Sequence, residues 1–152
     1  MSQWFECKVK YDRLAETGVQ KTVTEPYLVD ALSFTEAEAR ITDEMQPFIS
    51  GEFAVEAVKR VNFSDIFYNA AGDRWYKVKT NFITIDEKTA VEKRTASFQL
   101  VQASDFQGAL DVYLEGMKGT MADYEIFSIT ETPLMDVFPA KLGEFKEEKS
   151  KS

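Results

Sequence analysis

The chain has 152 residues, 26 acidic and 18 basic side chains for a net charge of -8, no histidine and one cysteine. Without histidine it cannot contain a Ser-His-Asp or Cys-His nucleophile, or a zinc or haem site that uses an imidazole. One cysteine excludes an internal disulfide and a CxxC motif, and an apolar content of 44% at this length supports a packed core without such staples.

Two strands are predicted at the start of the chain. Residues 4–11 alternate apolar and polar side chains, which is typical of a half-buried antiparallel strand. A polar turn region at residues 12–22 precedes a second apolar stretch at residues 23–31. Because Pro26 cannot donate to a strand ladder, the second strand is expected to be an edge strand or to carry a bulge. Cys7 lies on the apolar side of the first strand, which predicts a buried thiol.

A helix and a third strand follow. Ser33 and Glu36 form a capping box, the S-x-x-E pattern that starts a helix. Residues 53–61 predict the third strand, and residues 68–73 form a short polar connection to the rest of the chain. The apolar face of the helix has helical spacing and consists of Ala37, Ile41, Met45 and Phe48.

The second half contains the same kinds of element in the same order. Strands are predicted at residues 75–82, 95–103 and 124–132, with a turn region at residues 86–92. Between the last two strands, a helix is predicted to start at Ser104 or Asp105 and to end at Lys118-Gly119-Thr120, with an apolar face of Ala109, Val112, Tyr113, Gly116 and Met117.

The two halves also align in sequence. Residues 4–11 match residues 75–82 at an offset of 71, and residues 21–45 match residues 93–117 at an offset of 72. After the helices the offset returns to 71, so that Asp65-Ile66-Phe67 aligns with Asp136-Val137-Phe138. This self-similarity predicts a tandem duplication.

The predicted fold is therefore an α+β fold made of a duplicated ββαβ unit, with six mainly antiparallel strands and two helices in pseudo-twofold symmetry. The repeats span residues 4–67 and 75–138 of a single compact domain at residues 1–139, whose strands form either one sheet or two. Residues 140–152 have few bulky apolar side chains and are expected to be a frayed charged tail.

One constellation on the predicted strands suggests a binding face. On the polar side of each first strand a tryptophan accompanies two lysines, and these residues are Trp4, Lys8 and Lys10, and Trp75, Lys77 and Lys79. Aromatic rings among cations on an open sheet are used to stack bases and follow phosphates in proteins that bind single-stranded nucleic acid. The interpretation that we favour is structural: each tryptophan closes one end of a half core or lines a contact between the halves, while the lysines keep exposed strands from aggregating.

No catalytic, cofactor or metal site is predicted. Asp65 and Asp136 lack the Asp-Thr/Ser-Gly turn of an aspartic protease and are followed by bulky apolar residues, which indicates a packing motif. Lys118-Gly119-Thr120 resembles the end of a phosphate-binding loop, but the preceding GxxxxG spacing is missing. We therefore expect no enzymatic activity and no cofactor.

Several segments resemble an uncharacterised bacterial and phage family of domains of unknown function, over nearly the whole chain to Pro139. They are Trp75-Tyr-Lys-Val-Lys79, Asn81-Phe-Ile-Thr-Ile-Asp-Glu-Lys88, Leu100-Val-Gln-Ala103, Gly116-Met-Lys-Gly-Thr-Met-Ala-Asp-Tyr-Glu-Ile126 and Met135-Asp-Val-Phe-Pro139. The resemblance implies an intracellular protein of anaerobic bacteria or their phages. It assigns no catalytic or binding residue.

The expected function is that of a nonenzymatic interaction or regulatory module in the cytoplasm, which forms a homo-oligomer or binds another protein. Neither a secretory signal nor a membrane span is expected, because residues 1–10 carry charges and no stretch is long and apolar enough. The alternative is binding of single-stranded nucleic acid or a small anionic ligand on the Trp/Lys face.

Overall fold

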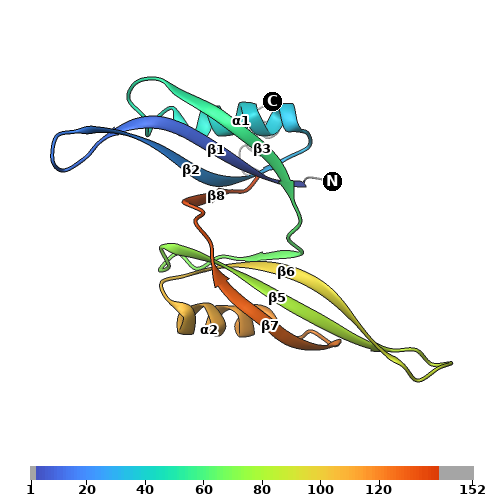
Figure 1. The fold of residues 1–152 in the computed structure, drawn as a ribbon. Coiled ribbons are helices and arrows are strands. Elements are labelled where there is room, and N and C mark those ends of the chain that lie inside the picture. Colours follow the sequence, from blue (N-terminus) through green and yellow to red (C-terminus); the bar gives the residue numbers. More distant parts are fainter. Residues whose placement is uncertain (1–2, 141–152) are drawn as a thin grey trace, which may run out of the picture. The chain divides into compact units, whose positions relative to one another are not determined.

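The computed structural model describes residues 3–140, which form an α+β fold. Packing divides the chain into two compact units, unit 1 with residues 3–61 and 134–140 and unit 2 with Asn62–Pro133. The described residues contain, in chain order, β1 (Gln3–Leu14), β2 (Gln20–Ala31), α1 (Phe34–Met45), β3 (Phe53–Val61), β4 (Asp65–Phe67), β5 (Arg74–Ile85), β6 (Glu92–Ala103), α2 (Phe106–Gly116), β7 (Asp123–Glu131) and β8 (Asp136–Phe138) (Figure 1).

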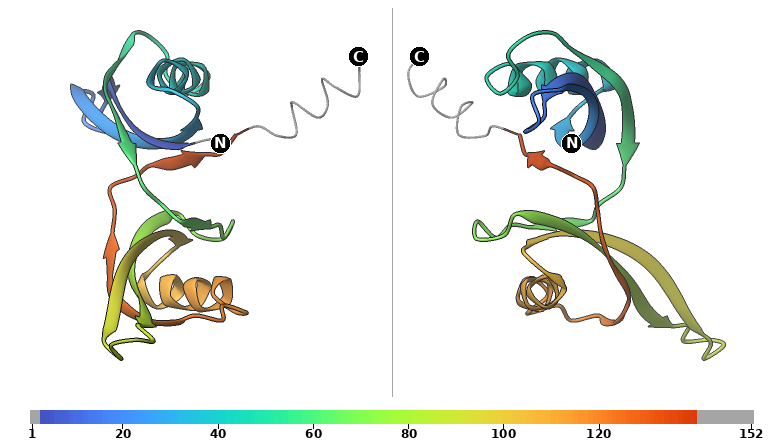
Figure 2. Two further views of the ribbon diagram at one scale, coloured as in Figure 1. Left: turned by 90° about the vertical axis from the view of Figure 1, so that its right-hand side faces the viewer. Right: turned by 60° about the vertical axis from the view of Figure 1, so that its left-hand side comes forward.

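Each unit has one four-stranded sheet. The strand order is β3-β1-β2-β8 in unit 1 and β4-β6-β5-β7 in unit 2. The six long strands pair antiparallel, as predicted, and the strands of each sheet curve around the helix of their own unit (Figure 2). The sequence left open whether the strands form one sheet or two, and the described strands form two.

The predicted number of six strands is wrong, since residues 3–140 form eight. The two additional strands are β4 and β8, which are the repeated Asp-Ile-Phe and Asp-Val-Phe segments. Both pair in parallel, β4 with β6 and β8 with β2. A three-residue strand is too short to show a period of two, so the sequence pattern indicates only a packing motif at these two segments.

The two short strands are exchanged between the two halves of the sequence. β4 follows β3 of unit 1 in the chain but belongs to the sheet of unit 2, and β8 follows β7 of unit 2 but belongs to the sheet of unit 1. Each sheet is therefore completed by a segment from the other half of the sequence. The predicted single domain at residues 1–139 stays a prediction, and residues 141–152 of the predicted tail lie outside the described residues.

Both helices begin as their sequences predict. The Ser33 side chain accepts a hydrogen bond from the Glu36 backbone N–H at 3.1 Å, and Asp105 accepts one from the Gly108 N–H at 2.7 Å. After α2, Gly119 has a φ of 85°, in the left-handed region where glycine is favoured. The predicted helix starts are thus confirmed, whereas α2 ends at Gly116, before the predicted end at Lys118-Gly119-Thr120.

Each helix buries an apolar stripe against its own sheet. In α1 the stripe is Ala37, Ile41 and Met45, and in α2 the buried residues are Ala109 and Tyr113. The two core clusters are centred on β1 and β2 with α1, and on β5 and β6 with α2. Phe48, predicted on the buried face of the first helix, instead lies beyond its end and is 75% exposed.

Cys7 is part of the core of unit 1, as predicted. Its side chain is fully buried, and this burial, with smaller contributions from Glu6 and Glu38, raises the pKa of its thiol to about 12. A thiol that remains protonated at neutral pH is a poor nucleophile.

β2 is not an edge strand, because β1 and β8 flank it. Pro26 pairs with Lys8 on the β1 side, while β8 contacts only Tyr27, Leu28 and Val29. The proline therefore lies just beyond the stretch that β8 covers, and its carbonyl accepts a hydrogen bond from the Met135 N–H at 2.9 Å. The short length of β8 allows proline in this strand.

Among the described residues, no helix combines the length and the apolar character that crossing a membrane requires.

Candidate functional site

The predicted Trp/Lys face in unit 1 is partly exposed. Trp4, Lys8 and Lys10 lie on the same side of β1, with Trp4 half-buried and both lysines exposed. This arrangement agrees with the alternation that the sequence predicts, and it leaves the lysine ammonium groups accessible to solvent.

In unit 2 the corresponding tryptophan is not available for stacking. Trp75 is only 3% exposed, and its ring packs edge-to-face on Tyr68 with the centroids 5.9 Å apart. Lys77 is exposed and Lys79 half-buried on the same side of β5. The structural interpretation of Trp75 is therefore the better one, since the residue is packed within unit 2.

The lysines of β5 contact two phenylalanines instead. The Lys77 Nζ lies 5.3 Å from the centre of the Phe98 ring, and the Lys79 Nζ lies 4.5 Å from that of Phe127. Both distances are in the range of a cation–π contact. We call these four residues the Lys/Phe strip.

Sequence reasoning missed both phenylalanines of the Lys/Phe strip. Phe98 lies opposite Lys79 in the β5–β6 register. Phe127 is the extra residue of a bulge in β7, where the register with β5 passes from Lys79–Ser128 to Thr80–Ile126. An alternation search on β6 could have found Phe98, but a bulge breaks the alternation and hid Phe127.

A charged cluster lies beside the Lys/Phe strip. Arg94 Nε donates to Glu125 Oε1 at 2.8 Å, and Asn81 Nδ2 donates to the same oxygen at 3.4 Å. The Arg94 hydrogen bond is the main reason that the pKa of Glu125 is lowered. This carboxylate is therefore compensated within unit 2 and does not cancel the charge of Lys77 or Lys79.

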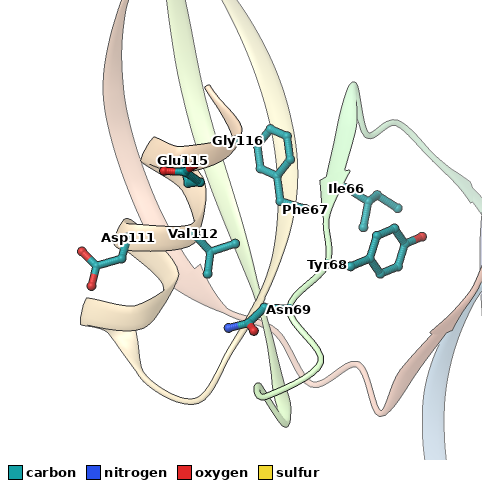
Figure 3. Close-up of a pocket in the computed structure, with 8 residues that line it drawn as sticks. All are labelled: Ile66, Phe67, Tyr68, Asn69, Asp111, Val112, Glu115 and Gly116. Carbon is teal, nitrogen blue, oxygen red and sulfur yellow. The ribbon is translucent and has the colours of Figure 1, made fainter. Parts of the chain in front are cut away.

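A second candidate site in unit 2 is an open groove of about 610 Å³ beside α2. In Figure 3, Phe67 of β4 turns toward Gly116 on the helix, while Ile66 and Tyr68 project to the other side of their strand. The lining consists of Ile66, Phe67, Tyr68, Asn69, Asp111, Val112, Glu115 and Gly116. Sequence analysis placed Val112 and Gly116 on an apolar helix face but did not predict a groove.

Buried polar groups in both units were also missed. In unit 1 the buried Glu25 accepts hydrogen bonds from Tyr11 at 2.7 Å and Tyr27 at 3.2 Å. Burial, together with Glu25, raises the pKa of Tyr27. In unit 2 the buried Thr80 hydroxyl lies 2.6 Å from Gln99 Oε1 and 2.7 Å from the Tyr113 hydroxyl. These groups satisfy one another inside the cores, which is typical of structural polar networks.

Comparison with known protein families shows to which family the chain belongs. The pattern of one family, described as a domain of unknown function (DUF4494), matches residues 3–140. The chain belongs to the DUF4494 family. No curated protein and no solved structure matches it significantly. The resemblance to an uncharacterised domain family is confirmed, whereas the bacterial or phage origin stays a prediction.

Within residues 3–140 of this DUF4494 domain, no three His, Cys, Asp or Glu side chains gather as ligands for a metal ion.

Proposed function

We propose that this DUF4494 domain is a nonenzymatic interaction and regulatory module of the bacterial or phage-infected cytoplasm, and that it self-associates. The observation that carries the proposal is an apolar surface on β7, which lies at the edge of the unit 2 sheet. There Phe127 is 63% exposed, Ile126 is partly exposed, and Met121 just before the strand is 96% exposed. Large apolar side chains left exposed on one edge strand are candidates for contact with another protein.

Two of the three acidic side chains of β7 are compensated within unit 2, which reduces the repulsion between two paired copies. Glu125 is bonded to Arg94, and Glu131 lies 3.9 Å from Arg74, so both carboxylates have partners within unit 2. An edge strand offers a row of backbone groups to another strand, and two copies of the same strand can pair around a twofold axis. Phe127 is the extra residue of the bulge, and its ring, although it contacts Lys79, is exposed enough to pack on a partner.

Sedimentation equilibrium of the full chain over a range of concentrations tests the proposal. We expect a reversible dimer, and we expect Phe127→Glu to weaken it by at least about 30-fold, since loss of a buried aromatic anchor at an interface costs about 2 kcal/mol or more. Phe48→Glu is the matched control, because Phe48 is an exposed phenylalanine of unit 1. A chain that remains monomeric at every concentration would contradict self-association, and equal effects of the two variants would contradict the role of β7.

A second candidate function is binding of single-stranded nucleic acid or a small anionic ligand on the Lys/Phe strip. It is favoured by the two cation–aromatic pairs that Lys77 and Lys79 of β5 make with Phe98 of β6 and Phe127 of β7. Lysines can follow phosphates while exposed aromatic rings stack on bases.

Titration of a labelled short oligothymidylate at several salt concentrations tests this second function. The variant Lys77→Ala with Lys79→Ala is expected to weaken binding and to reduce the slope of log K against log salt by about 1.4, because each phosphate contact to a single strand contributes about 0.7. Lys8→Ala with Lys10→Ala is the control on β1. No binding of the unaltered chain at low salt would exclude the strip as a nucleic-acid site.

We further propose that the two halves arose by duplication of a ββαβ unit. Three observations support this origin: the corresponding strands have the same order in both sheets, the bulges fall at aligned positions in β3 and β7, and β8 and β4 pair with aligned residues of β2 and β6.

A further inference from the structure

The two units provide an internal comparison at the place where each helix meets its exchanged strand. In unit 1, Phe138 of β8 is opposite Val29 of β2, and in unit 2, Phe67 of β4 is opposite Val101 of β6. The helices are aligned by their buried residues, since Ala37, Ile41 and Met45 have the same spacing as Ala109, Tyr113 and Met117. By this correspondence Arg40 is equivalent to Val112, and Glu44 to Gly116.

In unit 1 the Arg40 guanidinium connects the helix to both strands. Its Nη1 donates to the backbone carbonyl of Asp30 at 2.6 Å and to that of Phe138 at 3.4 Å. Its Nη2 donates to the Pro139 carbonyl at 3.1 Å and lies 3.6 Å from Glu44 Oε1. The Arg40 side chain is only 17% exposed. The space between α1 and β8 is thus occupied by a guanidinium that has acceptors on several sides.

In unit 2 the aligned positions supply no such group. Val112 has no donor and a short side chain, and Gly116 has no side chain at all. A Cβ at position 116 would lie 2.7 Å from Cδ1 of Phe67, so any larger residue would require this ring to move. The result is the open groove between α2 and residues 66–69 (Figure 3).

The rim of the groove carries negative charge. Asp111 and Glu115 belong to its helical side, where the Asp111 carboxylate points away from β4 in Figure 3, and Asn69 lies at one end. Asp111 accepts a hydrogen bond from Gln107 at 3.1 Å, and Glu115 lies 2.6 Å from the Lys118 ammonium. The Glu115 and Lys118 side chains are both more than two-thirds exposed, and exposed pairs of this kind contribute little and exchange readily.

We infer that the groove beside α2 binds the guanidinium group of an arginine side chain that a partner protein inserts. This inference deepens the proposed interaction function and rests on it. In unit 1 Arg40 directs the donors of its planar guanidinium to three backbone carbonyls, and by the same correspondence the carbonyls beside the groove are those of Gln102, Phe67 and Tyr68. The acidic side chains at the rim favour a positively charged ligand. The aliphatic stem of the arginine packs on Val112 and Phe67.

The experiment is a titration of the full-length, isotopically labelled chain with the peptide acetyl-Gly-Arg-Gly-amide, monitored by backbone amide chemical shifts. We expect saturable shifts at Phe67, Asn69, Val112 and Gly116, with a weak dissociation constant on the order of 1 mM for so small a ligand. The same peptide with citrulline, the neutral analogue of arginine, is expected to cause no shifts at these positions.

Two matched variants locate the site. Val112→Arg places a guanidinium in the groove from within the chain, and is expected to weaken binding of the arginine peptide by at least tenfold. Leu114→Arg adds the same charge on the exposed side of α2 and is expected to leave binding within about twofold.

The converse test is made in unit 1. Arg40→Ala removes the guanidinium there and is expected to lower the midpoint of thermal unfolding. Addition of millimolar ethylguanidinium is expected to raise that midpoint again, because the small cation can occupy the vacated position.

Absence of shifts at millimolar peptide, equal binding of the citrulline peptide, or equal effects of Val112→Arg and Leu114→Arg would overturn the inference. Equal binding of a lysine peptide would overturn the assignment of a guanidinium. These outcomes are distinct from failure of the proposed self-association, which is measured as a molecular mass and depends on Phe127.

Discussion

Gly72→Ala is expected to destabilise unit 2 by about 3 kcal/mol, at the upper end of what overpacking normally costs. A Cβ at position 72 would lie 2.5 Å from the Cα of Ala103, 2.6 Å from its N and 2.8 Å from its C. All three are backbone atoms at the end of β6, so no side-chain rotation relieves the contact. Either the connection between β4 and β5 or the end of β6 must move.

Moving either segment breaks other contacts. The Gly72 carbonyl accepts a hydrogen bond from Gln102 Nε2 at 3.1 Å, and its N–H donates to the Asn69 carbonyl at 2.8 Å. Asp105, two residues after Ala103, caps α2. The extra methyl group is therefore expected to disturb the turn, the end of β6 and the helix start together.

Urea unfolding followed by tryptophan fluorescence measures this effect. In a Trp4→Phe background Trp75 is the only tryptophan, so the signal reports unit 2. Gly108→Ala is the matched control: its Cβ would meet the end of a side chain, Asp105 Oδ1 at 3.0 Å, and alanine is preferred to glycine within a helix. The control is expected to change stability by less than about 1 kcal/mol. A Gly72→Ala midpoint equal to that of the unaltered chain would show that the close approach is not maintained in solution.

Most of the regular structure could be predicted because its signals are local. The alternation at residues 4–11 and 75–82 marks β1 and β5, and the side chains of Ser33 and Asp105 mark the helix starts. Each of these signals lies within a window of a few residues. The exchange of β4 and β8 could not be predicted in this way, because it depends on the pairing of Phe138 with Val29, more than a hundred residues away in the chain.

The candidate sites were less predictable, since they depend on which side chains meet across elements. The sequence predicts the lysines of β5 as part of a binding face. Trp75, however, packs against Tyr68, and the aromatic rings beside the lysines are phenylalanines of the neighbouring strands. One feature of the sequence could have indicated the groove. The alignment of the halves places Val112 at the position of Arg40, and valine cannot make the hydrogen bonds that arginine makes in unit 1.

The exchanged strand β8 is expected to be essential for the stability of unit 1. A chain that ends at Pro133 lacks the buried side chains of Leu134 and Val137, and it lacks the Phe138 ring that stacks on Tyr27 with the centroids 5.9 Å apart. At about 1.5 to 3 kcal/mol for each fully buried apolar side chain, the loss of Leu134 and Val137 alone is about 3 to 6 kcal/mol. Arg40 also loses the carbonyls of Phe138 and Pro139 as acceptors.

A loss of this size is comparable with the whole stability of many domains, so a large fraction of unit 1 is expected to be unfolded in the chain that ends at Pro133. Unit 2 is expected to remain folded, because its exchanged strand β4 is still present. Amide hydrogen exchange, resolved by residue, distinguishes the two units. The chain that ends at Ala140 is the control, since it keeps β8 and lacks only the residues that follow, and it is expected to match the full chain.

Adding back the missing strand tests the mechanism directly. A synthetic peptide of residues 134–140 is expected to restore protection in unit 1 of the shortened chain in a concentration-dependent way, because a strand that binds the folded form stabilises it by mass action. A peptide in which Val137 is replaced by aspartate is expected to fail, since it would bury a charge where Val137 is 6% exposed. If the amides of unit 1 were as protected from exchange in the chain ending at Pro133 as in the chain ending at Ala140, β8 would contribute no measurable stability to unit 1. The expected result instead makes the folding of unit 1 depend on a segment from the other half of the sequence.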